Sequence, residues 1–451
     1  MFLETIRSPG LAHLAYLVGD GDEAIAIDPP RDVERVLAAA RAHGARVTHV
    51  LETHRNEDLV VGSPELAART GATIHHGAAL DFGYGVATEE GALFGAGDVV
   101  LSALETPGHT PESLSFVLRD RSTGQSPLAV FTGDALFVGE VGRTDLAGDE
   151  EEAAAALYAS LHDKLLPLGD HVMIHPAHGA GSVCGEGMAD RDVSTLGYER
   201  RHSPALQLDR AAFIARKKAE RHVVPPYFRE MEKLNLAGPP VLHHLPEAPA
   251  LGLEAFDEAA RSGARIVDVR SAEAHVGAAI PEALALPLSV LSAYAGWLLD
   301  PDRPVLLVAE DRAQVDEAVQ RLARLGRTRV AGHLAGGMPT WETAGRPLRR
   351  LGLATVEDLR AQLEEAPGQI LDVRKASEHD DARLPGSTHA FLGELPKKLG
   401  DGTLPKGRLV AFCGSGQRAT VAASLLAAEG REVAVALGSM AAWQAKGHPT
   451  R

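Results

Sequence analysis

Short apolar runs separated by polar turns open the chain and predict strands. Residues 13–18 and 24–28 form two such runs, and the Gly-Asp-Gly-Asp turn at 19–22 between them predicts a hairpin. Residues 32–43 then carry apolar side chains at helical spacing, and residues 47–51 return to a strand pattern. In α/β folds, polar residues that follow the C-terminal end of a strand are where sites are built. We therefore expect functional residues directly after residue 51.

The C-terminal half contains an internal repeat. Residues 266–270, Ile-Val-Asp-Val-Arg, return 104 positions later as residues 370–374, Ile-Leu-Asp-Val-Arg. The pattern Gly-x-Met-x-x-Trp-x-x-x-Gly-x-Pro at 336–347 returns 102 positions later at 438–449. Each copy alternates apolar strands with helices, which is typical of a parallel sheet covered on both faces. Two similar α/β domains therefore follow one another.

Length and composition indicate a globular protein of several domains. With 451 residues, of which 45% are hydrophobic and 24% charged, the chain is too long for one hydrophobic core. A basic helical run at 206–222 is followed by prolines between 239 and 249, which mark a linker. These features and the repeat predict domains at 1–240, 241–350 and 351–451.

Charge and apolar runs narrow the function classes. Lys and Arg number 45 against 61 Asp and Glu, and the net charge of -16 argues against binding to nucleic acid or anionic membranes. No apolar run approaches the roughly 20 residues of a membrane span, and the first residues lack the pattern of a signal peptide. We therefore expect a cytoplasmic protein. Because only Cys184 and Cys413 are present, there is no disulfide framework, and each is a candidate for chemistry.

Metal-capable side chains occur in four segments in a fixed order. They are His-Arg-Asn-Glu-Asp-Leu at 54–59, Thr-Pro-Gly-His-Thr at 106–110, Phe-Thr-Gly-Asp at 131–134 and His-Pro-Ala-His-Gly at 175–179. Together they resemble the motifs of the metallo-β-lactamase superfamily, whose first motif is H-x-H-x-D-H. The resemblance implies an αββα sandwich with a metal at one rim, followed here by the two repeated α/β domains with parallel sheets.

The first segment departs from the family signature at Asn56 and Leu59, where histidines are usual. Their loss removes a ligand from each half of a two-metal site, which disfavours a zinc hydrolase of the glyoxalase II kind. His54, His109 and Asp134 remain, and two imidazoles with one carboxylate are the donor set of non-haem iron(II) oxygenases. The persulfide dioxygenase branch of the superfamily uses this triad, so the resemblance implies one Fe(II) per chain.

Other residues near these motifs are candidates for supporting roles. Arg143 lies in a Gly-Arg-Thr-Asp segment that resembles the same branch, which implies a contact with substrate. Cys184 lies in a glycine-rich segment that resembles forms fused to rhodanese domains, and it is either a buried filler or a carrier of persulfide. Asp58 and His178 either support the metal ligands or are remnants of a second metal site. Two further histidines match no motif and are expected at the surface: His75 and His76.

The second copy of the repeat carries a cysteine directly after a predicted strand, in a loop of small residues. The loop after Cys413 comprises Gly414, Ser415, Gly416 and Gln417, and Arg418 then begins a helix. Backbone N–H groups of such a loop and a helix N-terminus favour a thiolate and an anionic sulfur species. With the repeated patterns, the segment resembles rhodaneses, sulfurtransferases that carry sulfur as a cysteine persulfide, which implies catalytic roles for Cys413 and Arg418. Related phosphatases have longer loops, so phosphate chemistry is disfavoured.

The first copy has Ala-Glu-Asp at 309–311 in place of the cysteine, so we interpret it as a structural or docking module. The combined prediction is oxidation of a low-molecular-weight thiol persulfide to sulfite, coupled to sulfur transfer that produces or consumes thiosulfate. The partners would be dioxygen and a persulfide of the glutathione or coenzyme A type, in a homo-oligomer. Two alternatives are a thioesterase-type metallohydrolase fused to rhodanese and a sulfur carrier that does not oxidise its cargo.

Overall fold

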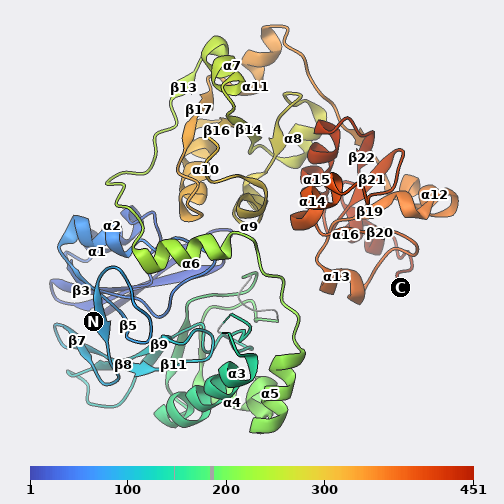
Figure 1. Ribbon diagram of the computed structural model, residues 1–451. Helices are drawn as coiled ribbons and strands as arrows, with labels where there is room; N and C mark the ends of the chain where they lie inside the picture. Colours follow the sequence, from blue (N-terminus) through green and yellow to red (C-terminus); the bar gives the residue numbers. More distant parts are fainter. Residues whose placement is uncertain (147, 183–186) are drawn as a thin grey trace. The chain divides into compact units, whose positions relative to one another are not determined.

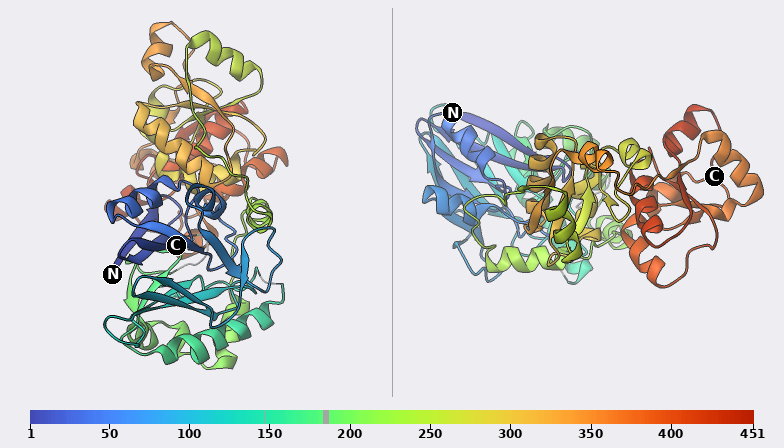
Figure 2. Two further views of the ribbon diagram at one scale, coloured as in Figure 1. Left: turned by 90° about the vertical axis from the view of Figure 1, so that its left-hand side faces the viewer. Right: turned by 90° about the horizontal axis from the view of Figure 1, so that it is seen from above.

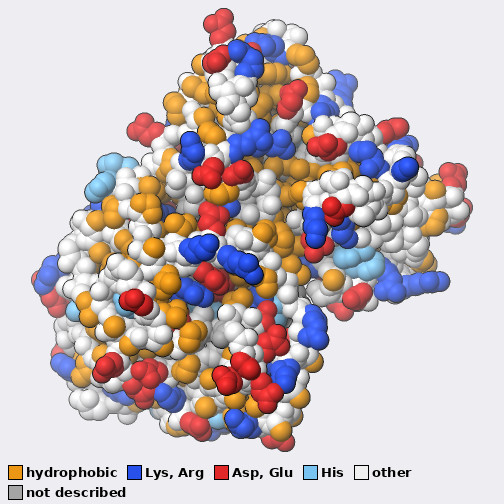
Figure 3. All heavy atoms as spheres, in the orientation of Figure 1, with side chains coloured by type: hydrophobic (Ala, Val, Ile, Leu, Met, Phe, Trp, Pro, Cys, Tyr) orange, Lys and Arg blue, Asp and Glu red, His pale blue; other side chains and the backbone are white. Residues whose placement is uncertain are grey.

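The computed structural model describes residues 1–146, 148–182 and 187–451 (Figure 1). Their contacts divide them into two compact units. The first unit comprises Met1–Leu245 and Ala323–Gly326, and the second comprises Pro246–Leu322 and Arg327–Arg451. Among the described residues, no helix combines the length and the apolar character needed to cross a membrane. Acidic and basic side chains are interspersed on the face drawn in Figure 3.

Two mixed sheets form the centre of the first unit (Figures 1 and 2). In the first sheet the order is β1-β2-β3-β4-β5-β6, and in the second it is β12-β11-β10-β9-β8-β7. The strands of the first sheet are β1 Phe2–Ser8, β2 His13–Asp20, β3 Glu23–Ile27, β4 Arg46–Leu51, β5 Thr73–Gly77 and β6 Val86–Thr88. Those of the second are β7 Leu93–Ala96, β8 Val99–Glu105, β9 Leu114–Asp120, β10 Ala129–Gly133, β11 Met173–Pro176 and β12 Ser194–Thr195.

Helices cover the outer faces of both sheets. They are α1 Glu34–Ala42 and α2 Ser63–Thr70 on the first sheet and α3 Glu150–Ala159, α4 Leu196–His202 and α5 Arg210–Ala219 on the second. Helix α6, Phe228–Ala237, contacts the loop after β4. Tyr16 and Val18 of β2 point into the core between the sheets, whereas Leu17 points into the core beneath α1. Because successive side chains of a strand face opposite sides, a strand covered on both faces reads as one continuous apolar run. The αββα sandwich predicted from the motifs is confirmed.

The predicted hairpin at the start of the chain is confirmed, because β2 and β3 pair in antiparallel register with Asp20 opposite Glu23. The prediction of a helix over 206–222 is wrong at both ends. Helix α5 begins only after Asp209, whose carboxylate accepts a hydrogen bond of 2.9 Å from the backbone N–H of Ala212. This cap fixes the start of the helix.

Two parallel sheets with the same strand order form the second unit. The orders are β13-β17-β16-β14-β15 and β18-β22-β21-β19-β20, and the strand pairs recorded in them are parallel. The strands are β13 Ala250–Leu251, β14 Arg265–Asp268, β15 Leu284–Ala285, β16 Val305–Val308, β17 Val330–Leu334, β18 Gly352–Leu353, β19 Ile370–Asp372, β20 Thr388–His389, β21 Leu409–Phe412 and β22 Val433–Val435. The parallel sheets predicted from the repeat are confirmed.

Helices pack against both of these sheets and complete two separate apolar cores. Those of the first copy are α7 Leu253–Arg261, α8 Ala272–Gly277, α9 Leu288–Leu298, α10 Arg312–Arg324 and α11 Gly337–Thr343. Those of the second are α12 Val356–Glu365, α13 Ala376–Asp381, α14 Leu395–Gly400, α15 Gln417–Ala428 and α16 Ser439–Ala445.

The repeated sequence letters make the same contacts in both copies. Arg270 pairs with Asp268, and Arg374 pairs with Asp372, each at 2.6 Å between Nη2 and Oδ2. The indole N–H of each repeated tryptophan donates to the carbonyl of the repeated proline, at 2.9 Å in the first copy and 3.0 Å in the second. The repeat therefore preserves the same polar contacts in both copies.

Phe131 tests the core between the two sheets of the first unit. Its side chain is fully buried, and its ring lies 5.0 Å from that of Tyr16 on the opposite sheet. We expect Phe131→Ala to lower the free energy of unfolding of this unit by about 3–5 kcal/mol, because it leaves a large cavity. Urea unfolding followed by circular dichroism measures the loss. Leu93→Ala is the control, because Leu93 is 65% exposed, and a comparable loss there would contradict this assignment of the core.

Candidate functional site

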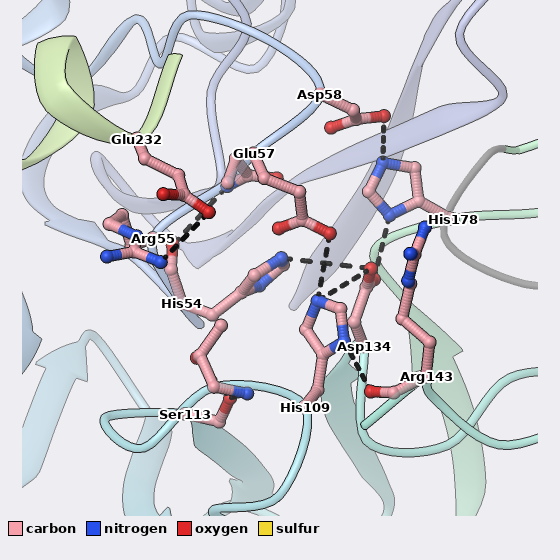
Figure 4. A network of polar contacts seen from close by, with 12 residues as sticks. His54, Arg55, Glu57, Asp58, His109, Ser113, Asp134, Arg143, His178 and Glu232 are labelled. Carbon is pink, nitrogen blue, oxygen red and sulfur yellow. Dashed lines mark hydrogen bonds and ion pairs between the residues drawn. The ribbon is translucent and has the colours of Figure 1, made fainter. Parts of the chain in front are cut away.

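Three metal-capable side chains meet where strands of the two sheets end (Figure 4). His54 follows β4, His109 lies in the loop between β8 and β9, and Asp134 follows β10. One ligand atom from each lies within 4.8 Å of the others. Asp134 Oδ2 is 3.8 Å from His54 Nε2 and 3.6 Å from His109 Nε2. The structure thus brings together the three residues that the sequence predicted as metal ligands.

The donor atoms of this triad are suited to an ion. All three side chains are buried, and among the described residues His54 Nε2 and Asp134 Oδ2 have no hydrogen-bond partner. Buried polar atoms are almost always satisfied, so polar atoms that converge without protein partners fit a cation-binding site. Two imidazole nitrogens and a carboxylate oxygen can hold a divalent transition metal.

Backbone and side-chain contacts orient both imidazoles. His109 Nδ1 donates to the carbonyl of Arg143 at 3.0 Å, which leaves its Nε2 atom directed at Asp134 and Glu57. Thr53 Oγ1 donates to Asp28 at 2.7 Å and accepts from His54 Nδ1 at 2.9 Å. Such contacts fix the tautomer and the ring direction that metal binding requires.

Asp58 and His178 lie behind Asp134. The Nδ1 atom of His178 donates to Asp134 Oδ1 at 2.7 Å, and its Nε2 atom lies 3.1 Å from Asp58 Oδ2. Burial alone would lower the pKa of His178, but the carboxylates of Asp134 and Asp58 raise it well above its usual value. His178 is therefore held as a cation between two carboxylates. Both predicted supporting residues contact the triad or each other.

Asn56 and Leu59, the two positions that lack the family histidines, are buried and fixed by hydrogen bonds to their backbone. Leu59 is buried, and the side chain of Asn56 is buried as well. The amide of Asn235, on α6, donates to the carbonyls of Asn56 and Leu59 at 2.6 and 2.7 Å. These contacts tie the loop after β4 to the helix that ends the unit.

Glu57 is a residue of this site that the sequence reasoning missed. It is 1% exposed, and its Oε1 atom lies 3.2 Å from His109 Nε2. Burial would raise the pKa of Glu57, but the His109 imidazole outweighs it and lowers that pKa to about 2. For His109, burial lowers the pKa and the Glu57 carboxylate raises it to about 9. The sequence signal that could have identified Glu57 is its place inside the first motif, where it is another side chain able to bind a metal.

Arg143 contributes its backbone carbonyl to the site, while its guanidinium group pairs elsewhere. The guanidinium forms two hydrogen bonds with Asp145, of 2.7 and 2.6 Å. It also borders a cavity of about 300 Å³ whose lining includes the basic residues Arg216, Lys217 and Arg221 of the α5 region. The predicted contact of Arg143 with substrate stays a prediction. Cys184, the other predicted substrate contact here, lies outside the described residues.

The expectation that His76 lies at the surface is wrong. Its side chain is buried, its Nε2 lies 2.7 Å from the carbonyl of Tyr84, and its ring stacks on Phe82 at 4.2 Å. His75 is partly buried and faces His49 at 3.1 Å. Both histidines belong to β5, whose faces are covered in the folded unit, so their burial depends on contacts that the local sequence does not reveal.

In the second unit, the loop after β21 surrounds the buried sulfur of Cys413. The backbone N–H of Gly416 donates to Cys413 Sγ at 3.1 Å, and the Cys413 N–H donates to Ser439 Oγ at 3.1 Å. Gly416 has φ of 102°, a left-handed conformation that favours glycine and starts α15. The loop Gly414, Ser415, Gly416 and Gln417 thus directs a donor at the sulfur, as its composition predicted.

Arg418 lies beside this loop and pairs with Glu378 through two contacts, at 2.5 and 2.7 Å. Burial lowers the pKa of Arg418, but the hydrogen bonds with Glu378 outweigh it and raise that pKa above its usual value. The first copy also reaches the loop, because Ser289 Oγ donates to Gln417 Oε1 at 3.0 Å and Tyr294 hydrogen-bonds Arg418. The copy without a cysteine therefore supports the loop that has one.

Comparison with known families gives two matches. Residues 8–178 match the metallo-beta-lactamase superfamily, and residues 253–344 and 355–446 each match the rhodanese-like domain. The chain is similar to the mitochondrial persulfide dioxygenase ETHE1 of Bos taurus, with 30% identity over 247 residues, covering 53% of this chain and 84% of the relative. It is 37% identical to a hydroxyacylglutathione hydrolase of Polaromonas sp. over 174 residues, covering 36% of this chain and 60% of that protein.

Among solved structures, a metallo-beta-lactamase from Staphylococcus aureus aligns with 74% of this chain and 98% of its own, at 30% identity and a TM-score of 0.66. An ETHE1 structure from Myxococcus xanthus, at 30% identity and a TM-score of 0.47, covers 54% of this chain and all of that one. The Staphylococcus aureus alignment extends beyond the first unit, since that unit makes up little more than half of this chain.

Gly142 tests whether the triad is a metal site. A Cβ atom there would lie 2.0 Å from the carbonyl oxygen of Asp134 and 3.3 Å from His109 Cβ. Because Gly142→Ala must displace the Asp134 backbone, we expect the affinity for a divalent metal to fall by about tenfold or more. Competition with a coloured chelator measures the change. Gly95→Ala is the matched control, since a Cβ there meets nothing within 4 Å. Equal affinities in the two variants would place the metal elsewhere.

Proposed function

Because the chain belongs to the metallo-beta-lactamase superfamily in its N-terminal part and continues into two rhodanese-like domains, we propose that it is an enzyme of sulfane-sulfur metabolism. It oxidises a low-molecular-weight thiol persulfide at the His54, His109 and Asp134 site and transfers sulfur at Cys413. The oxidation consumes one persulfide, one dioxygen and one water, and it releases the thiol, sulfite and two protons. Its thiol carrier is of the glutathione or coenzyme A type.

The donor set of the first site is the observation that carries this proposal. Two imidazoles and one carboxylate converge, while His178, which could serve a second metal, is held between two carboxylates. Asn56 and Leu59 offer no imidazole in the places where a two-metal site would need one. One Fe(II) per chain fits these donors and would supply the dioxygen chemistry.

The chain's own residues prepare the site. The carbonyl of Arg143 and the hydroxyl of Thr53 hold the two imidazoles with Nε2 directed inward. Burial of all three donors excludes bulk water, which would otherwise compete with the persulfide. In the cavity beside Arg143, Glu140 and Glu220 pair with Arg216 and Lys217, so Arg221 is the lining residue that we propose for the anionic part of a thiol carrier. Arg143 and Cys184 are proposed as contacts with that substrate.

At Cys413 the proposed step is a sulfur transfer with no net oxidation. The Cys413 thiolate attacks the sulfane sulfur of a persulfide, a new S–S bond forms, and the carrier thiolate leaves. Sulfite then takes the sulfane sulfur from the cysteine persulfide, which yields thiosulfate and restores the thiolate. The Gly416 N–H and the start of α15 stabilise the negative sulfur, and Arg418 lies beside the loop. The reverse direction would supply persulfide to the first site.

A second candidate for the first unit is hydrolysis of a thioester. The 37% identity to a hydroxyacylglutathione hydrolase favours it, whereas the residues at positions 56 and 59 disfavour a second metal. Metal analysis and oxygen uptake with glutathione persulfide separate the two. One iron per chain and persulfide-dependent oxygen uptake support the dioxygenase, two zinc ions with thioesterase activity support the hydrolase, and absence of both leaves only a sulfur carrier.

His109→Ala tests the first site. We expect persulfide-dependent oxygen uptake to fall by at least about 10³-fold, because the variant loses one of three metal ligands. Thiosulfate sulfurtransfer should stay within twofold of wild type, since Cys413 lies in the other unit. An oxygen electrode and a thiocyanate-forming assay give the two rates. Oxygen uptake that survives the substitution would refute the assignment of His109.

Cys413→Ser tests the second site with the opposite pattern. The hydroxyl of serine cannot carry a persulfide, so sulfurtransfer should fall to background while oxygen uptake persists. Mass spectrometry of the wild type after incubation with thiosulfate should show one added sulfur on the peptide that contains Cys413. Sulfurtransfer retained by the variant would show that another residue is the sulfur acceptor.

A further inference from the structure

Glu57 places a second carboxylate against the triad. It lies three positions after His54 in the loop that follows β4, and its side chain turns toward His109 (Figure 4). The distance from Glu57 Oε1 to His109 Nε2 is 3.2 Å, and Glu57 is 1% exposed. The Nε2 atom is the ring nitrogen that does not contact the Arg143 carbonyl. Glu57 therefore adds a buried, metal-capable group beside the triad, next to His109.

The separations match those of neighbouring ligands on one ion. Nitrogen and oxygen ligands at about 2.1 Å from a metal, with angles between the octahedral and tetrahedral values, lie about 3.0–3.4 Å from each other. The 3.2 Å between Glu57 and His109 falls inside this range. The 3.6 and 3.8 Å that separate Asp134 from the two imidazoles lie just above it. Glu57 thus has the separation of a neighbouring ligand from His109, whereas Asp134 lies near both imidazoles.

Charge supports the same assignment. A buried carboxylate needs a compensating cation or several donors. The nearest imidazole to Glu57 is that of His109, 3.2 Å from its Oε1 atom, and the carboxylate of Asp134 approaches the same Nε2 atom to 3.6 Å. A divalent cation between Glu57 and Asp134 would attract both carboxylates, and their two negative charges would balance its charge.

We propose that Glu57 is a fourth protein ligand of the metal, so that the site consists of two histidines and two carboxylates. The inference rests on the proposed function, because it assumes a metal at the triad. Glu57 restores a donor to the loop in which Asn56 and Leu59 offer no imidazole. Two histidines and two carboxylates would hold one divalent metal, which would supply the dioxygen chemistry.

Cobalt(II) binding to the full chain tests the assignment without reference to activity. The visible absorption of bound Co(II) reports the number and arrangement of its ligands, and competition with a chelator gives its affinity. For Glu57→Gln we expect at least a tenfold weaker affinity and a changed Co(II) spectrum. Glu232→Gln is the matched control, because Glu232 pairs with Arg55 at 3.3 Å in the same region and is not part of the triad. It should stay within twofold of wild type with the same spectrum.

The outcomes separate this inference from the proposed function. Wild-type protein that binds no Co(II) would overturn the metal site itself and the inference with it. Wild type that binds Co(II), with Glu57→Gln unchanged in affinity and spectrum, would overturn the inference alone. If Glu57→Gln fails to fold, as judged by circular dichroism, Glu57→Asp replaces it in the test. This variant keeps the negative charge but shortens the side chain by one methylene. A weaker affinity with a changed spectrum then supports Glu57 as a ligand, and wild-type behaviour overturns it.

Discussion

The first site depends on the contacts of the Asp134 carboxylate, because its two oxygens face different partners. Oδ2 faces His54 and His109, whereas Oδ1 accepts the hydrogen bond from His178. Asp134 reaches this position because Gly133, directly before it, has φ of 53° and passes so close to Thr53 that a Cβ would lie 2.8 Å away. A glycine is therefore required at position 133, because the ends of two strands, one from each sheet, approach closely there.

The buried charges around Asp134 compensate one another in a chain that runs from Glu57 through His109, Asp134 and His178 to Asp58. Carboxylates and imidazoles alternate along this chain, so none of these charges stands isolated in a medium of low polarity. His178 at one end occupies Asp134 Oδ1, and Glu57 at the other end faces the donor atom of His109. His178 and Asp58 therefore occupy one side of Asp134, and the ligand atoms of His54 and His109 converge on its other side.

The second unit shows how one frame can support two different loops. In both copies a central strand ends at a loop that leads into a helix. In the first copy Asp311 accepts a hydrogen bond of 2.8 Å from the Gln314 N–H and caps α10 with its own carboxylate. In the second copy the sulfur of Cys413 receives the Gly416 N–H instead. A carboxylate in this place cannot form a bond to sulfur, whereas the Cys413 thiolate can attack a sulfane sulfur and displace a thiolate. The chemistry therefore differs although the frame is the same.

The sequence by itself determined the classes of fold and most members of both sites. Strand and helix patterns are local, and the motifs around His54, His109, Asp134 and Cys413 keep their spacing along the chain, so each could be recognised without coordinates. Only the tertiary structure decided which of these groups meet. Glu57 contacts His109, which lies 52 positions later in the chain. His76 is buried because it packs against Phe82 and Tyr84. Such contacts arise because separate loops close over the same strand ends, and the local sequence does not encode that closure at any one position.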